Sequence, residues 1–214
     1  GNKSGVIQPS FQGGIADGFV TEIKNDGSAI IKTSYFGTSG IDLIYGLKFD
    51  RKGFPYIMGT TTGSWPVVNA AYSNPGSKQF IAKLQPDLAA YVYSTIFGTS
   101  IAQPNISPIA FLVDRCENVY VSGWGGGING SYSPGTTQGL PETNPLNGIP
   151  IPDGKDFYFF VLEKNAQSRL FASHFGRNGG LGEHVDGGTS RFDANGVIYQ
   201  AICGECDGSA GFPI

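Results

Sequence analysis

The sequence predicts an all-β fold of about three four-stranded antiparallel blades, either a partial β-propeller or a fragment of a larger one. Three observations predict it: short segments rich in β-branched and aromatic residues, turn-forming residues between them, and an internal repeat. The 214 residues include 33 glycines and 13 prolines, which indicate many turns. Hydrophobic residues make up 40% of the chain, enough for a core, and no segment shows sustained helical periodicity.

The repeat is visible in the spacing of equivalent residues. Phe19 and Phe80 are 61 positions apart, as are Phe36 and Phe97. The step to the third copy is 78 positions, measured from Phe97 to Phe175. In every copy an aspartate precedes a tyrosine by six positions, at Asp50 and Tyr56, Asp114 and Tyr120, and Asp193 and Tyr199. This recurring order favours tandem four-stranded sheets, as in propeller blades, over the alternative of a β-sandwich.

Each copy contains four expected strands in the same order. They are residues 17–23, 34–38, 46–50 and 56–59 in the first copy, 80–84, 94–99, 110–114 and 119–123 in the second, and 156–162, 173–176, 191–193 and 197–199 in the third. Segments 25–27, 51–53 and 194–196 carry the Gly, Asn or Asp of tight hairpin turns. The recurring aspartates Asp50, Asp114 and Asp193 precede such turns, so we expect them to organise the turn rather than to catalyse.

These copies predict a single β-propeller region over residues 1–214. Its blade-like repeats are expected at about 14–76, 77–154 and 155–214, and residues 1–13 end a preceding blade connection. Propellers typically close with four to eight blades, and an open arc of three leaves two exposed sheet edges. We therefore expect further blades outside the chain, or completion by another chain.

Loop lengths predict which face of the blades carries the binding residues. The connections between the second and third strands (37–45, 98–108 and 176–188) and between successive copies (59–79 and 123–155) are long and share one face of the blades. Long loops on a rigid scaffold commonly carry binding residues. Aromatic candidates there are Trp65, Trp124 and Tyr132, although the insertion after Trp124 also fits a surface lid or spacer.

Titratable residues offer few candidates for catalysis. His174 occupies a strand position and is expected to fill the sheet. His184 lies in a long loop between Glu183 and Asp186, and these three residues are ligand-binding candidates. The alternative is that His184 is an ordinary loop residue held by hydrogen bonds. Nothing marks a nucleophile elbow for a serine hydrolase. No catalytic residue is assigned.

The cysteines divide between the two faces. Cys203 and Cys206 begin a long loop and are a candidate disulfide. Cys116 falls in a short turn on the opposite face, too far away to pair with them, and is expected to be a small buried thiol. No metal site or cofactor is expected; calcium in the Asp/Asn/Gly-rich loops and zinc beside the Cys203 pair are the alternatives.

Charge and hydropathy exclude some classes of partner. The formal net charge is −3, so a nucleic-acid-binding surface is not expected. No apolar run reaches the ~18 residues of a membrane span, so no transmembrane segment is expected. The chain starts at Gly1 without a signal peptide, which suggests a processed or excised piece.

The repeat pattern carries a family resemblance. Asp-x-Phe-Val-x-x-Ile, Tyr-Phe-Gly-Thr and Phe-Asp-x-x-Gly-x-x-Tyr resemble the SBBP-type β-propeller repeats of bacterial surface proteins. Residues 184–206 resemble the large gliding-motility-associated surface proteins of Bacteroidota. The resemblance implies export by type IX secretion to the cell surface or medium, with adhesion rather than catalysis. It supplies no catalytic residues.

The leading hypothesis is a non-enzymatic, adhesin-like interaction module of a large secreted protein. Its expected partners are a surface glycan or protein, other domains of the same protein, or secretion-machinery components that capture it as a substrate. The alternatives are a glycan-active propeller enzyme, with a site in the central channel, and a purely structural spacer.

Overall fold

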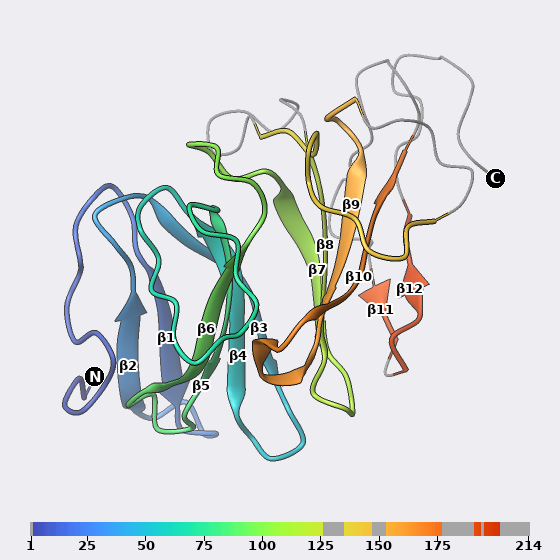
Figure 1. Cartoon of the computed structure of the whole chain (residues 1–214). Helices are drawn as coiled ribbons and strands as arrows, with labels where there is room; N and C mark the ends of the chain where they lie inside the picture. The colour runs from blue at the N-terminus through green and yellow to red at the C-terminus, as the bar shows by residue number, and fades with distance from the viewer. Residues whose placement is uncertain (1, 126–134, 147–152, 177–190, 194, 202–214) are drawn as a thin grey trace.

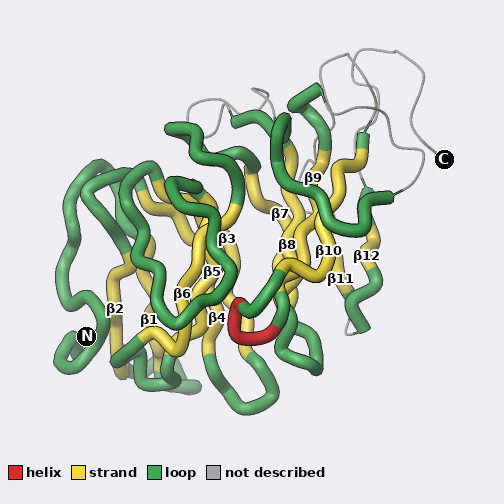
Figure 2. Tube along the Cα trace, in the orientation of Figure 1, coloured by secondary structure: helices red, strands yellow, loops and turns green. Residues whose placement is uncertain are grey.

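A computed structural model of the 214-residue chain describes all residues except 1, 126–134, 147–152, 177–190, 194 and 202–214. The described residues form an all-β structure of antiparallel sheets (Figures 1 and 2). Its strands are β1 (Gly18–Ile23), β2 (Ile30–Phe36), β3 (Asp42–Phe49), β4 (Pro55–Thr61), β5 (Gln79–Leu84), β6 (Tyr91–Phe97), β7 (Ser107–Val113), β8 (Val119–Trp124), β9 (Phe157–Leu162), β10 (Arg169–Phe175), β11 (Arg191–Phe192) and β12 (Ile198–Tyr199). A short 3-10 turn, η2 (Lys164–Ala166), joins β9 to β10. The all-β prediction is confirmed.

Strand pairing produces two complete sheets and two half-sheets. The complete sheets have the orders β3-β4-β5-β6 and β7-β8-β9-β10, whereas β1 pairs only with β2, and β11 only with β12, among the described strands. Neighbouring sheets meet along equivalent strands, with β3 beside β7 and β7 beside β11. In Figure 1 the half-sheets lie at opposite ends of this row.

The sheets are offset from the expected blades by half a repeat. Each complete sheet takes its first two strands from one sequence copy and its last two from the next, so the boundaries at 76/77 and 154/155 cut through sheets. The physical reason is that a sequence period gives the spacing of equivalent strands but not where one sheet stops. The long connection from β4 to β5 returns to the same sheet, whereas the connection from β2 to β3 changes sheets.

The hairpin turns form one end of the molecule and the long connections the other, as expected (Figure 1). The aspartate of each β3–β4-type turn accepts two backbone N–H bonds through Oδ1. The donors are Lys52 and Phe54 for Asp50, Cys116 and Asn118 for Asp114, and Asn195 and Val197 for Asp193, at 2.8–3.0 Å. The structural role of these aspartates is confirmed.

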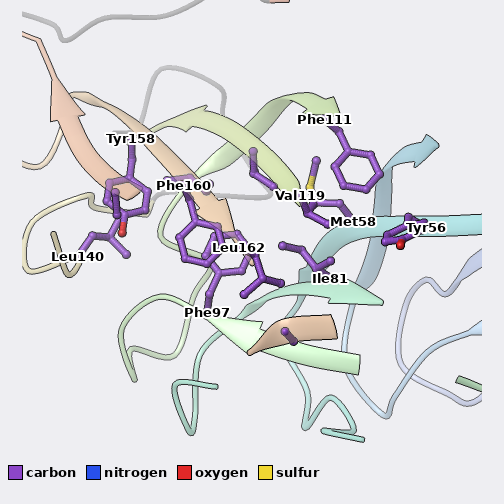
Figure 3. Packing of buried hydrophobic residues seen from close by; sticks show 14 of the residues in the cluster. Tyr56, Met58, Ile81, Phe97, Phe111, Val119, Leu140, Tyr158, Phe160 and Leu162 are labelled. Carbon is purple, nitrogen blue, oxygen red and sulfur yellow. The ribbon is translucent and has the colours of Figure 1, made fainter. Parts of the chain in front are cut away.

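The main core lies between the two complete sheets (Figure 3). The rings of Phe97 and Phe160 stack there with centroids 4.3 Å apart. Both faces of β4, β5 and β9 are buried. The buried positions of β5 include the polar residues Gln79 and Lys83, each of which has a polar partner. A second cluster, including Val20, Phe36 and Phe80, packs the β1–β2 half-sheet against β3–β6.

Candidate binding groove and loop face

A groove of about 430 Å³ lies along the meeting of the equivalent strands β3 and β7, with Phe192 of β11 at one side. Its remaining lining residues are Tyr45, Gly46, Leu47, Lys48, Met58, Ile109, Ala110, Phe111 and Leu112. Tyr45 and Leu47 are each 42% exposed. The volume is in the range of small-molecule sites, and none of these lining residues carries a carboxylate, an imidazole or a thiol.

Two matching β-bulges shape this groove. The pairing of β3 with β4 shifts register between Ile44 and Gly46, which leaves Tyr45 as the extra residue. The pairing of β7 with β8 shifts between Pro108 and Ala110, which leaves Ile109 as the extra residue. Bulges redirect side chains and are enriched beside functional sites. Both repeats therefore place a bulged side chain in the same groove.

Gly46 allows the two sheets to approach each other at the groove. A Cβ at this position would lie 2.6 Å from Cδ1 of Phe111, well inside van der Waals contact. Phe111 is only 8% exposed and belongs to the main core. Partial burial also raises the pKa of the Tyr45 hydroxyl.

The two tryptophans expected to offer stacking platforms are core residues. Trp65 is 6% exposed, stacks on Phe80 with centroids 3.5 Å apart, and donates from Nε1 to Ser94 Oγ at 2.9 Å. Trp124 is 4% exposed and packs against Phe157. Their position after or at the end of a strand suggested loop exposure, but the chain turns each indole back onto its own or the neighbouring sheet. Neither ring is available for stacking on a ligand in this structure.

The other expected site residues lie outside the described residues. These are Tyr132, Glu183, His184, Asp186, Cys203 and Cys206. The ligand-binding hypothesis for the first four and the disulfide hypothesis for the cysteine pair therefore stay predictions.

His174 fills a buried strand position, as expected, and also anchors a loop. Its Nδ1 lies 2.9 Å from Oε1 of Glu142, and its Nε2 lies 2.7 Å from the carbonyl oxygen of Thr137. Both ring nitrogens thus contact oxygen atoms of the β8–β9 connection, which ties that loop to β10. Glu142 belongs to the long β8–β9 connection, and no sequence spacing linked it to His174.

A buried amide network fixes the neighbouring loop. Asn105 donates from Nδ2 to the carbonyl of Thr136 and to Thr99 Oγ1, both at 2.8 Å, and its Oδ1 accepts the Thr99 N–H at 2.8 Å. Gln79 of β5 also bonds to Asn105: its Oε1 accepts the backbone N–H of Asn105, and its Nε2 donates to Asn105 Oδ1. These residues hold the β6–β7 and β8–β9 connections together. Sequence analysis missed them because isolated Gln and Asn residues carry no spacing signal.

The opposite, turn-bearing end holds an ion cluster. Lys83 Nζ lies 2.9 Å from Asp50 and 2.8 Å from Glu117, and Lys52 and Lys164 lie 3.3 Å and 3.0 Å from the other oxygen of Glu117. These hydrogen bonds, that of Lys83 foremost, outweigh partial burial and lower the pKa of Glu117 to about 2. The cluster ties the β3–β4, β7–β8 and η2 turns to β5.

Cys116 is a correction to the sequence-based expectation. It is an exposed free thiol rather than a buried one. The residue sits at the tip of the β7–β8 turn, where the backbone bonds of Asp114 direct the chain outward. Because the β7–β8 turn lies away from the main core, the Cys116 side chain is not covered by core residues.

Within the described part of the chain, no three His, Cys, Asp or Glu side chains gather in a way that could hold a metal ion. The same residues include no helix long and apolar enough to cross a membrane.

No family model matches the chain, and no curated protein matches it.

Proposed function

We propose that the chain is a non-enzymatic binding module of a β-propeller type, exported as part of a larger cell-surface protein, and that it binds an extracellular glycan in the groove between β3 and β7. The observation that carries the proposal is the pair of equivalent bulges at Tyr45 and Ile109, which open onto one groove from two repeats. Repeated bulges at a shared groove are hard to explain by packing alone, because each one interrupts a ladder of hydrogen bonds.

The chemistry of the groove supports binding over bond cleavage. Tyr45 supplies a ring face and a hydroxyl, Lys48 an ammonium donor, and Leu47 and Phe111 apolar walls. Sugar rings present both apolar faces and hydroxyls, so such a mixture suits them. Glycoside hydrolysis requires two carboxyl groups at a defined separation, and none of the described lining residues carries one.

The propeller arrangement is supported by the way the sheets repeat. Equivalent strands β3, β7 and β11 contact one another in succession, β3 beside β7 and β7 beside β11, as neighbouring blades of a propeller would bring them together. Export to the cell surface, adhesion and a role as a type IX secretion substrate rest on the resemblance to gliding-motility-associated surface proteins.

A glycan microarray followed by calorimetry on the best-bound oligosaccharide tests the proposal. Tyr45→Ala and Leu47→Arg should each weaken binding at least tenfold, since both side chains are exposed in the groove. Val67→Arg is the matched control, because Val67 is 44% exposed and lies outside the groove. No glycan bound by the wild type, or equal affinity in all three variants, would contradict the proposal. Glycan cleavage abolished by changing Glu183, His184 or Asp186 would favour the alternative of an enzyme.

A further inference from the structure

A second hollow lies beyond the groove, at the turn-bearing end of the same two strands. Its volume is about 270 Å³, and its walls are formed by the last residues of β3 and β7 and by the turns that follow them. Leu112 of β7 lines both the groove and this hollow. Arg51 and Arg115, one from each turn, also line it, so we call it the arginine hollow.

The two arginines are equivalent in the repeat and carry unpaired charges. Arg51 directly follows Asp50, and Arg115 directly follows Asp114. Both arginines are exposed, and among the described residues neither guanidinium forms a hydrogen bond or an ion pair. A guanidinium has five N–H donors and stays protonated at any ordinary pH. The hollow therefore offers two free guanidinium groups to a ligand.

The carboxylates near the arginines are engaged elsewhere. Asp50 accepts two backbone N–H bonds through Oδ1, and its Oδ2 lies 2.9 Å from Nζ of Lys83. Asp114 accepts two backbone N–H bonds through Oδ1 and bonds from two neighbouring side chains through Oδ2. Both oxygens of Glu117, in the neighbouring ion cluster, contact lysines. An anion that enters the hollow thus meets two cations that no described carboxylate has neutralised.

The turns themselves do not require an arginine. The third repeat has the same turn, in which Asp193 accepts the backbone N–H groups of Asn195 and Val197 at 2.8 Å and 2.9 Å. The residue after this aspartate is Ala194, which lies outside the described residues. Because the same backbone hydrogen bonds form beside an alanine, turn geometry does not account for the two arginines.

An exposed aromatic ring completes the hollow. Phe49, the last residue of β3, lines it and is 60% exposed. A sugar ring can pack its apolar face on such a ring, whereas a small inorganic anion gains nothing from it. Phe49 is four residues from Tyr45 of the groove, a distance of about 13 Å along a strand. One oligosaccharide can therefore contact both.

We propose that the glycan bound in the groove is acidic, and that a carboxylate on one of its sugar rings is held between Arg51 and Arg115 in the arginine hollow. This inference rests on the proposed function, because it names the class of glycan that the groove takes. The planar guanidinium matches the two oxygens of a carboxylate and binds them in pairs. Since the chain has a formal net charge of −3, its overall charge does not attract anions, and the preference depends on this local pair.

Calorimetry with two matched ligands tests the inference. One is an oligosaccharide of uronic acids, and the other is the same oligosaccharide with its carboxylates reduced to alcohols. The wild type should bind the acidic form at least tenfold more tightly, and this preference should shrink as the salt concentration rises.

Variants of the arginines locate the preference. Arg51→Gln and Arg115→Gln should each weaken binding of the acidic oligosaccharide at least fivefold and leave binding of the reduced form unchanged. Arg51→Lys, which keeps the charge but loses the planar fork, should bind with intermediate affinity. Lys24→Gln is the matched control, because it removes one positive charge from an exposed residue outside the hollow. All four variants should keep the melting temperature of the wild type.

Tyr45→Ala separates a failure of this inference from a failure of the proposed function. Weaker binding in Tyr45→Ala together with wild-type affinity in both arginine→Gln variants would overturn the inference and leave glycan binding in the groove intact. Equal affinity of the wild type for the acidic and reduced forms would do the same. Loss of binding in the arginine variants alone would keep the acidic ligand but contradict the groove. A wild type that binds neither these two ligands nor any other oligosaccharide would overturn both.

Discussion

The carboxylate of Glu117 lies 2.8 Å from the ammonium of Lys83, at the end of a turn in which the two equivalent positions are glycines. Glu117 has a φ of +70°, and Gly53 and Gly196 both have a φ of +83°. A residue with a Cβ is strained in this left-handed region. The ion cluster holds the glutamate there against its backbone preference, so charge and strain oppose each other at one residue.

Removing the charge of Glu117 should destabilise the protein in a pH-dependent way. Lys83 is almost fully buried and would lose one of its two carboxylate partners in Glu117→Gln. The cost should be about 1–3 kcal/mol near neutral pH. The folded pKa of about 2 lies below the ordinary 4.5, so this stabilisation is complete above pH 4.5 and lost as the pH falls toward 2. Urea titrations at several pH values should show the wild type and variant converging in acid; a pH-independent difference would contradict the assignment.

Backbone strain at the same position is separable from charge. Glu117→Ala and Glu117→Gly both remove the carboxylate, but only glycine accepts a φ of +70° without penalty. The glycine variant should therefore be more stable than the alanine variant by about 1 kcal/mol. The difference in stability between Asn118→Ala and Asn118→Gly, at the neighbouring residue, serves as the reference. Equal stabilities of the two Glu117 variants would contradict the prediction, because the turn would then adopt another backbone conformation in the alanine variant.

Trp124→Ala should lower the stability of the whole fold rather than specifically weaken ligand binding. The indole is 4% exposed and packs on Phe157, so truncation leaves a large cavity. The expected loss is about 3–5 kcal/mol in the free energy of unfolding. Thermal denaturation followed by circular dichroism measures it. Unchanged stability together with lost ligand binding would restore the original interpretation of Trp124 as an exposed platform.

The His174–Glu142 contact should determine the stability of the loop that precedes β9. In His174→Phe, the carbonyl of Thr137 and the carboxylate of Glu142 lose their partner, at a cost of about 1–3 kcal/mol. The amide of Thr143, which bonds to Ala172, should exchange with deuterium faster, whereas β5 amides should keep their relative protection. Faster exchange spread equally over both sheets would instead indicate a general loss of packing.

Cys116 should react with a maleimide in the native state within minutes, since it is exposed and free. Peptide mapping by mass spectrometry separates its labelling from that of Cys203 and Cys206. Labelling of Cys116 only after denaturation would contradict its exposed position.

The sequence predicted the strands well because each of them depends on local chemistry. Twelve expected segments correspond to the twelve strands of the described residues, and the aspartates accept the turn hydrogen bonds that their spacing indicated. The grouping of strands into sheets could not be predicted, because a periodic pattern looks the same wherever a repeat begins. The half-repeat offset appears only when the partner of β5 is known to be β4.

Site residues were predicted less well, for a related reason. Trp65 and Trp124 were chosen because aromatic residues near long loops are often exposed, but burial depends on how the chain folds back. The groove residue Tyr45 was missed because a bulge shifts register by one residue without a distinctive sequence. Gln79, Asn105 and Glu142 were missed because their partners are distant along the chain.

Calorimetry of the best-bound oligosaccharide with the wild type, Leu47→Arg and Val67→Arg tests the central claim, that the groove between the bulges of β3 and β7 binds a glycan. The account predicts that Leu47→Arg binds at least tenfold more weakly, while Val67→Arg, outside the groove, binds as the wild type does. Equal affinity in all three proteins would contradict it.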